Sequence, residues 1–436
     1  MTAQYLKKCF GYSFWVALEV VAFVGLPRLV VFPVGAYLLG KNEFGLFLFA
    51  MGIVMLLGKA PSVGLETGVI RHLVGLQPPA KDLLVSTGLH LCKIAMLAVV
   101  GLGIGVVVTS RCFWPIDAKL IWCLIPLLIL LYSWNLFELQ MVRYRVERRF
   151  ALRTAWYSIL GSLLFIAVPG ALLGGVVGMA WGYALGFVIA HIILSFGQRM
   201  PFRKSSYDAA SARLLKQVWF HVTVASVLAI SSRYIYRIML GVFHSYSDVA
   251  VLFGATNVVD LCLAPMCILG SLLLSVLGGF RRLEEVGRKQ RYTVLAAGVS
   301  IAVGASLVVL FAGSFILSVM FPRFSGESAR ILRLIVMVIP CGVAILFTRP
   351  FVVKFGPIKF MPALNLITLL AHLVPGILLV PKFATKGAAI SYNIGYAVSA
   401  VSYLAALVWI LKFSGRYQPI SEVVRATNGD CTITTS

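Results

Sequence analysis

Charged residues are scarce in this sequence, and acidic residues are the scarcest. Only 12% of the 436 residues are charged, with 15 Asp and Glu against 38 Lys and Arg, while 60% are hydrophobic. A soluble domain needs more charge to cover its surface, and the apolar runs here reach the ~20 residues that a helix needs to cross a bilayer. Because unpaired backbone groups are costly in lipid, the composition predicts an all-α, polytopic membrane protein.

Several kinds of chemistry lack their residues as well. The sequence contains no CxxC pair and no His/Cys cluster with metal-ligand spacing, so no metal site is expected. It has no GxxxxGKS or GxxxxGKT loop, which excludes a P-loop ATPase site in this chain. Of its cysteines only Cys112 lies in an expected outer loop, so no disulfide framework is expected. Large catalytic loops are missing too, and we expect neither enzyme activity nor a cofactor.

Twelve apolar segments are long enough to cross the membrane, and the polar connections between them are short. We therefore expect an N-terminal six-helix lobe over residues 1–200, a cytoplasmic linker over 201–213, a C-terminal six-helix lobe over 214–420 and a cytoplasmic tail over 421–436. The expected spans are 12–39, 43–63, 84–109, 119–140, 154–174, 176–197, 218–242, 249–279, 293–321, 333–353, 359–381 and 387–411.

One spaced pattern occurs twice, 209 residues apart, and a Val-Pro-Gly tripeptide precedes each copy at 168–170 and 374–376. The copies read Gly178-x-Ala180-x-x-Tyr183-x-x-Gly186-Phe187 and Gly387-x-Ala389-x-x-Tyr392-x-x-Gly395-Tyr396. Six spans in each half let both copies cross in the same direction, as a parallel repeat requires. In membrane proteins such a repeat is typical of transporters whose binding site lies between the halves.

The net charge of +23 is concentrated in alternate loops rather than spread evenly. Three loops near residues 143–153, 199–216 and 281–291 are rich in Lys and Arg. By the positive-inside rule these loops and both termini face the cytoplasm. The alternative use of the clusters is binding of anionic lipid head groups. Clusters that alternate with topology do not indicate a nucleic-acid-binding surface.

Charges inside the expected spans are informative, because each costs several kcal/mol unless it is paired or hydrated. From the ~1.5 Å rise per residue of a helix, Arg233 and Asp260 lie at matching depths, and so do Glu19 and Lys93. We expect these to be ion pairs, acting either as structural clamps or as coupling groups. The charged residues inside or at the margins of spans are Arg28, Lys59, Lys93, Arg233, Arg237, Glu19, Glu66, Glu138 and Asp260.

Arg28 follows a proline in the first span, which predicts a broken helix whose freed backbone groups face an interior cavity. Arginine in such a cavity suits an anion, and its planar fork suits phosphate. We expect Arg28, Lys59, Arg233 and Arg237 to form the substrate site, and Asp260, Glu19 and Lys93 to serve coupling. For Lys59 and Arg237, as for Glu138, the alternative is that the side chain reaches out to water from near a span end.

Five segments follow one another along nearly the whole chain, at 27–47, 64–71, 233–241, 315–334 and 379–389. The last reads L-V-P-K-F-A-T-K-G-A-A and is the most recognisable. In order and spacing these segments resemble the Wzx-like polysaccharide flippases of the multidrug/oligosaccharidyl-lipid/polysaccharide exporter superfamily. One departure is Ser232, which stands where that family usually has an acidic residue.

The resemblance implies a flippase that moves an undecaprenyl-diphosphate-linked oligosaccharide across the bacterial inner membrane by alternating access. It implies a monomer that works with membrane lipids, a polysaccharide polymerase and assembly proteins. The alternatives are an ion-coupled small-molecule or drug antiporter of the same superfamily and a scaffolding partner of a synthase complex. A major-facilitator carrier is disfavoured, because the loop over 64–82 lacks that family's GxxxDRxGR motif.

Overall fold

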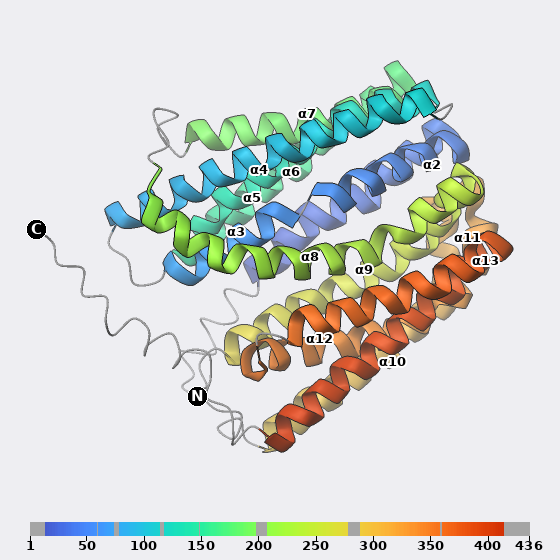
Figure 1. Cartoon of the computed structure of the whole chain (residues 1–436). Helices are drawn as coiled ribbons and strands as arrows, with labels where there is room; N and C mark the ends of the chain where they lie inside the picture. The colour runs from blue at the N-terminus through green and yellow to red at the C-terminus, as the bar shows by residue number, and fades with distance from the viewer. Residues whose placement is uncertain are drawn as a thin grey trace, which may run out of the picture.

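The protein is a bundle of long helices, as seen in a computed structural model that describes residues 14–58, 60–73, 78–113, 117–147, 149–197, 207–277, 288–357 and 360–413. No strand occurs in those ranges, which confirms the predicted all-α fold. Figure 1 shows the helices running along one common direction, with the earlier elements (blue to green) on one side and the later ones (green to red) on the other.

The helices of the first part are η1 (Val21–Gly25), η2 (Pro27–Val31), α2 (Phe32–Gly58), α3 (Ala60–Leu73), α4 (Pro78–Phe113), α5 (Ala118–Val146), α6 (Phe150–Leu163), η3 (Leu164–Ile166) and α7 (Ala167–Gly197). Those of the second part are α8 (Ala209–Phe243), α9 (Tyr246–Leu277), α10 (Arg288–Met320), η5 (Pro322–Phe324), α11 (Ser325–Ile335), α12 (Val338–Phe355) and α13 (Phe360–Phe413).

Within the described ranges, nine helical stretches are long and apolar enough to cross a membrane. Three of them have 45, 48 and 53 residues, about twice the length of one crossing. Each of the three is interrupted by non-helical backbone, at Gly40, at Gly174 and Gly175, and at Ala384. The division into twelve crossings stays a prediction, which these interruptions support.

Close backbone contacts establish that the chain reverses within α7. A Cβ added at Gly178 would lie 2.0 Å from the carbonyl oxygen of Gly170, and one at Gly186 would lie 2.9 Å from that of Leu163. Contacts at 170–178 and 163–186 are those of an antiparallel hairpin. The glycines of the first motif copy are therefore needed because two helix backbones touch there.

The second copy makes the same contacts at the same offset. A Cβ at Gly387 would lie 2.2 Å from the carbonyl oxygen of Leu379, and one at Gly395 would lie 2.2 Å from the ring of His372. Positive φ angles also recur 209 residues apart, at 59° in Gly175 and 49° in Ala384. The repeated pattern thus encodes one helical hairpin that occurs in each half of the chain.

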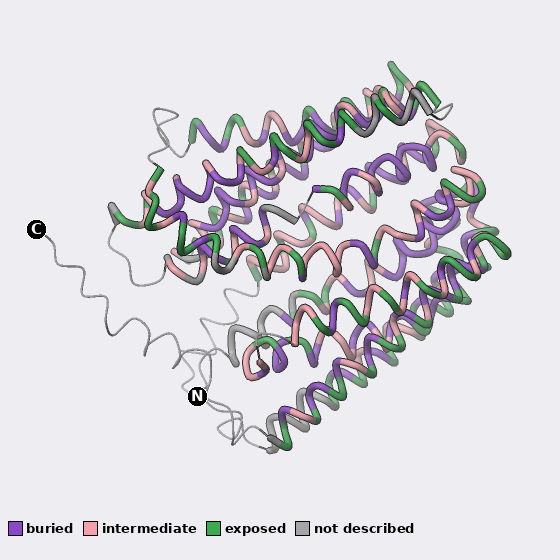
Figure 2. Tube along the Cα trace, in the orientation of Figure 1, coloured by how far each residue is buried: buried purple, intermediate pink, exposed green. Residues whose placement is uncertain are grey.

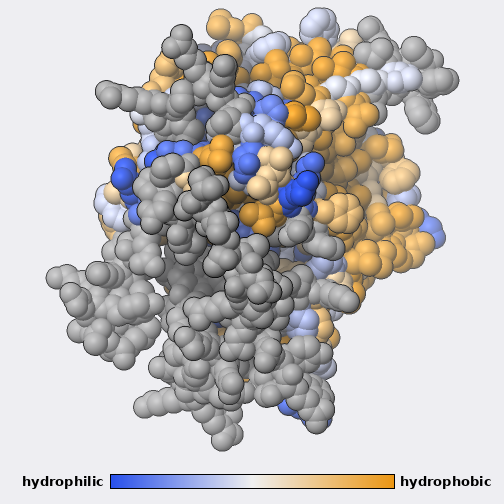
Figure 3. Space-filling view, turned by 60° about the vertical axis from the view of Figure 1, so that its left-hand side comes forward, coloured by the Kyte–Doolittle hydropathy of each residue, from blue (hydrophilic) through white to orange (hydrophobic). Residues whose placement is uncertain are grey.

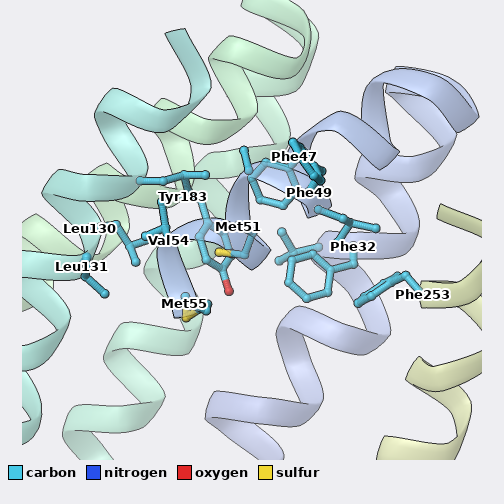
Figure 4. Close-up of a cluster of buried hydrophobic side chains, with 14 of the residues drawn as sticks. Phe32, Phe47, Phe49, Met51, Val54, Met55, Leu130, Leu131, Tyr183 and Phe253 are labelled. Atoms are coloured by element: carbon cyan, nitrogen blue, oxygen red, sulfur yellow. The ribbon is translucent and has the colours of Figure 1, made fainter. Parts of the chain in front are cut away.

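The hydrophobic core is centred on α2. Figure 4 shows Phe32, Phe47 and Tyr183 gathered around this helix, with Phe253 approaching from α9. The ring of Phe32 lies 5.9 Å from that of Tyr183 and 5.4 Å from that of Phe253, so the first helix touches both halves. Buried residues follow α2 and the middle of the bundle in Figure 2, whereas α10 and the end of α13 expose apolar side chains, as a lipid-facing surface requires.

The two halves fit closely at one end of the bundle. A Cβ at Gly45 would lie 1.7 Å from the carbonyl oxygen of Tyr246, so α2 and α9 touch through their backbones. Close by, Lys41 Nζ lies 2.5 Å from Glu327 Oε2 of α11, an ion pair between the halves. Under the predicted orientation this is the outer end.

Other ion pairs mark the opposite end, where Arg143 contacts Asp82 at 3.1 Å and Arg145 contacts Glu66 at 3.3 Å. Figure 3, in which the left-hand side of Figure 1 comes forward, shows hydrophilic residues gathered toward this end and hydrophobic ones over the flank. The exposed charges thus concentrate at the ends of the bundle, as expected for a membrane-spanning fold, and the orientation itself stays a prediction.

Candidate anion-binding site

The first helix is widened, not broken, around its proline. η1 and η2 are π-helical turns in which the amide of Leu26 donates to the carbonyl of Val21 and that of Phe32 to the carbonyl of Pro27. Pro27 has no N–H to donate, and the wider turn accommodates its ring without ending the helix. The predicted break is therefore corrected to a π-helical segment, with Arg28 in its second turn.

Arg28 is held by the opposite half of the protein. Its Nη1 lies 2.6 Å from Asp260 Oδ2 of α9. The side-chain amide of Asn257, one helical turn before Asp260, donates to the Arg28 carbonyl oxygen at 3.3 Å. In a π-helix the carbonyl of Arg28 would accept a hydrogen bond from the residue five positions later, but that residue is Pro33, which has no N–H group. Asn257 thus satisfies an acceptor that the first helix cannot.

The ion pair predicted between Arg233 and Asp260 is therefore wrong in this conformation, because Asp260 pairs with Arg28. Arg233 and Asp260, for which matching depths were predicted, nevertheless line the same cavity, and Arg28 lines it too. The direction in which each side chain leaves its helix decides the partner, and depth alone does not contain it.

Three of the predicted substrate residues line one cavity. Arg28, Arg233 and Arg237 surround a cavity with about 480 Å³ of empty space, including its open part, and among the described residues Asp260 is the only acidic one in its lining. The remaining lining residues are Tyr234, Tyr236, Leu252, Thr256 and Tyr392. The fourth predicted residue, Lys59, lies outside the described residues. With one pair neutralised, the cavity keeps two guanidinium charges for an incoming anion.

Arg237 is positioned by aromatic rings. Its guanidinium carbon lies 5.0 Å from the ring centroid of Tyr234 and 5.0 Å from that of Phe253. Its stem passes Gly52 of α2, where an added Cβ would come within 3.6 Å of the Arg237 Cβ. The cation–π contacts hold the positive charge inside the bundle without a carboxylate. Arg237 therefore lines the cavity and does not extend to water at a helix end.

A second cavity, with about 760 Å³ of empty space including its open part, adjoins the first within the second half, and Arg233 lines both. Helices α8, α9, α12 and α13 form its wall, and Arg349 of α12 adds a second guanidinium. Arg349 was not predicted as a site residue, although it lies inside the expected span over 333–353. The available signal was an arginine inside an apolar run and directly before a proline.

Glu19 takes part in a separate cluster in the first half. Its Oε1 lies 3.0 Å from Arg153 Nη2 of α6. Nearby, Glu138 accepts hydrogen bonds from the hydroxyl of Tyr157 at 2.6 Å and from the indole of Trp134 at 2.9 Å. The Arg153 guanidinium carbon also lies 5.3 Å from the Tyr157 ring centroid. Arg153 thus pairs with Glu19, while the Tyr157 hydroxyl and the Trp134 indole hold Glu138 inside the bundle.

The predicted pair of Glu19 with Lys93 is consequently wrong. Arg153 had been assigned to a cytoplasmic loop, but α6 begins at Phe150 and brings this residue into the bundle. Lys93 is half-buried on α4 and makes no ion pair with Glu19 in the described structure. Across the described residues no group of three His, Cys, Asp or Glu side chains could hold a metal ion.

Comparisons with known proteins reveal no relative by sequence. No protein-family profile matches the chain, and no curated protein does so either. Among solved structures, an inward-facing multidrug-resistance MATE transporter of the MOP superfamily is similar over 92% of this chain and 99% of its own, with a TM-score of 0.71 and 14% identity.

The lipid II flippase MurJ, in an inward closed conformation, is similar over 94% of this chain and 89% of its own, with a TM-score of 0.70 and 13% identity. A MOP-superfamily transporter from Pyrococcus furiosus, described as having a binding pocket of reversed polarity, is similar over 93% and 95%, with a TM-score of 0.69 and 14% identity. These matches span both halves of the molecule. The chain therefore has the all-helical fold of the MOP-superfamily transporters.

Proposed function

We propose that this protein is a flippase that carries an undecaprenyl-diphosphate-linked oligosaccharide across the bacterial inner membrane for surface polysaccharide biosynthesis. The observation that carries the proposal is the cavity lined by Arg28 from the first half and by Arg233 and Arg237 from the second. A diphosphate crossing the membrane needs its charge matched along a path of low dielectric, and guanidinium groups match phosphate by charge and by shape.

Alternating access fits the distribution of these residues between the halves. Arg28 and Asp260 belong to opposite halves, so their ion pair makes or breaks as the halves move. We propose that the substrate diphosphate competes with Asp260 for Arg28, which couples occupancy of the cavity to that motion. The lobes would then be residues 1–200 and 214–420, joined by the linker 201–213.

Glu19 and Glu138 support a coupling role for the first half. Glu19 pairs with Arg153, and Glu138 accepts hydrogen bonds from Tyr157 and Trp134, so this cluster offers carboxylates that can take up a cation during the cycle. Lys93, set apart from this cluster, is not needed for that role. We propose that the protein works as a monomer among membrane lipids, alongside a polysaccharide polymerase and assembly proteins.

The second candidate function is an ion-coupled drug antiporter, which the Glu19–Glu138 cluster and the similarity to MATE transporters favour. A cationic drug, however, would meet three arginines and one already paired carboxylate in the central cavity. The positive charge of the central cavity therefore favours the flippase over the drug antiporter.

Reconstitution distinguishes the two. Protein in liposomes is supplied with a fluorescent short-chain polyprenyl diphosphate that carries one sugar, and translocation is followed by dithionite quenching. If the protein is a flippase, the lipid moves to the other leaflet and ethidium stays on the side of the membrane to which it was added. Ethidium transport against a proton or sodium gradient, without lipid translocation, would establish the antiporter instead.

A further inference from the structure

The cavity within the second half has a composition different from that of the central one. It contains the guanidinium groups of Arg233 and Arg349, and the part of the chain that the structure describes contributes no acidic residue to its lining. Arg349 is exposed to the cavity, and within the described residues no carboxylate lies within ion-pairing distance of it. A cation placed inside a membrane bundle is costly without a counter-charge, so the counter-charge is expected to arrive with a ligand.

The rest of the lining suits a carbohydrate. Tyr396, Tyr403 and His372 offer ring faces and edges, and hydroxyl and amide groups lie between them. The Tyr403 hydroxyl donates to Asn365 Oδ1 at 3.3 Å, while the Asn365 amide donates to the Ala225 carbonyl at 2.9 Å. This fixes the ring of Tyr403 at the wall. A mostly apolar cavity with a few oriented polar groups is typical of a small-molecule site.

One buried hydroxyl in the described lining lacks a hydrogen-bond partner. Thr368 Oγ1 is buried and has no hydrogen-bond partner, although it lies on the wall of the same cavity. Buried hydroxyls are nearly always paired in folded proteins. The side chain can supply a hydrogen bond to a group that enters the cavity, as the sugar hydroxyls of a glycan would.

Arg233 connects this cavity with the central one, because it lines both. A ligand whose diphosphate lies among Arg28, Arg233 and Arg237 can therefore place the sugars next to the diphosphate in the cavity of the second half. We propose that this cavity is the glycan subsite of the flippase and that its glycan is acidic, with a sugar carboxylate or sugar-linked phosphate bound by Arg349. The inference rests on the proposed function and specifies its substrate class.

The test compares three probes on purified protein in nanodiscs. They are a short-chain polyprenyl diphosphate, the same lipid carrying a neutral disaccharide, and the same lipid carrying a disaccharide that ends in a uronic acid. The parent protein should bind the acidic probe at least tenfold more tightly than the neutral one. The variant Arg349→Gln should lose that preference and bind the other two probes as the parent does, whereas Arg349→Lys should keep part of it.

Two controls separate loss of the subsite from loss of the fold. Arg333→Gln removes an exposed arginine from α11, outside both cavities, and should leave all three affinities unchanged. Thr368→Val keeps the shape of the side chain and should weaken only the two glycosylated probes. A disaccharide with a sugar-linked phosphate in place of the uronic acid identifies which anion is preferred.

The results distinguish the two levels of the proposal. If the parent binds none of the diphosphate lipids, the proposed function fails. If it binds them with equal affinity whether the sugar is acidic, neutral or absent, the flippase stands and the acidic-glycan subsite is overturned. The subsite is overturned as well if Arg349→Gln weakens all three probes by the same factor, because Arg349 then supports the fold or the diphosphate site.

Discussion

The guanidinium of Arg28 and the carboxylate of Asp260, 232 residues apart in the chain, lie 2.6 Å apart across the boundary between the two halves. Both side chains are partly exposed, at 24% and 32%, so the pair faces the cavity and can be reached by a ligand. A diphosphate can replace Asp260 on both electrostatic and geometric grounds, because a guanidinium pairs with phosphate oxygens as it does with a carboxylate.

Replacing Asp260 by Asn should stop transport without unfolding the protein. Arg28 then has no partner in the empty cavity, so the diphosphate binds at least as tightly and leaves more slowly. We expect lipid translocation in liposomes to fall at least tenfold. Asp82→Asn, which removes a carboxylate at the end of the bundle, is the matched control. Full activity of Asp260→Asn would show that the pair is only a structural clamp.

Arg28→Ala should weaken binding of the polyprenyl diphosphate roughly ten- to hundredfold, since one charge-assisted contact is worth ~1.5–3 kcal/mol. Arg28→Lys keeps the charge but loses the planar fork, and should restore only part of the affinity. Because Arg28→Ala also strands Asp260, the double variant Arg28→Ala/Asp260→Asn is measured beside it. If both retain the affinity of the parent, the assignment of this anion site is abandoned.

Ala384→Gly should stabilise the protein. Ala384 has φ 49° and ψ −128°, a region that glycine occupies freely and that costs other residues about 1–3 kcal/mol. The reverse change at the equivalent position of the first half, Gly175→Ala, should destabilise by a similar amount. Thermal unfolding in detergent measures both. Equal unfolding temperatures for all three proteins would contradict the assigned backbone conformation.

Linking the two halves at their closed end should block transport. Lys41→Cys and Glu327→Cys place thiols where the ion pair between α2 and α11 lies, and a short bis-methanethiosulfonate reagent can bridge them. We expect the doubly substituted protein to lose lipid translocation on cross-linking and to regain it with reductant. Each single cysteine variant serves as the control. Undiminished translocation by fully cross-linked protein would mean that this end does not open.

Asp208 caps the N-terminus of α8, and its contribution to stability depends on pH. Its carboxylate accepts hydrogen bonds from the hydroxyl and the backbone amide of Ser211, and these lower the pKa of Asp208 below its ordinary value of 3.8. The helix cap stabilises the folded protein fully at pH values above 3.8, the ordinary pKa of the carboxyl group. This stabilisation is lost as the pH falls through the lowered pKa that Asp208 has in the folded protein. Asp208→Ala should cost about 1 kcal/mol near neutral pH and remove this component of acid sensitivity.

Asp208→Asn keeps the cap without the titration. Its unfolding temperature near neutral pH should lie close to that of the parent, and the difference should not grow on acidification. A parallel fall of parent and Asp208→Ala with pH would show that other carboxylates account for the acid response.

The sequence predicted the membrane fold and three of the arginines that line the central cavity, because apolar length and buried charge are properties of a single segment. The partner of a charged side chain, in contrast, depends on how two segments pack together. Asp260 was given to Arg233 and Glu19 to Lys93, whereas the structure pairs them with Arg28 and Arg153. The spacing of residues along one helix predicts how deep a side chain lies in the membrane. The side to which it points depends on how the helices pack against one another.

Span boundaries were the second weakness. Arg153 was assigned to a cytoplasmic loop, yet it lies within the bundle. A charge near the end of a hydrophobic segment looks the same in sequence whether it meets water or a neighbouring helix. The repeated glycine pattern stands out in the sequence because two helix backbones in contact tolerate so few residue types.

The reversal within α7 has a consequence for how the chain is made. The residues around it, Leu173, Gly174, Gly175 and Val176, carry no charge, and Leu173 is 90% exposed. The matching turn in α13 is flanked by Lys382 and Lys386. An uncharged turn provides little resistance to crossing the bilayer, whereas lysines oppose the transfer of a turn to the outer face. The first hairpin is thus suited to leave the translocon as one unit, while the two lysines should slow the insertion of the second hairpin.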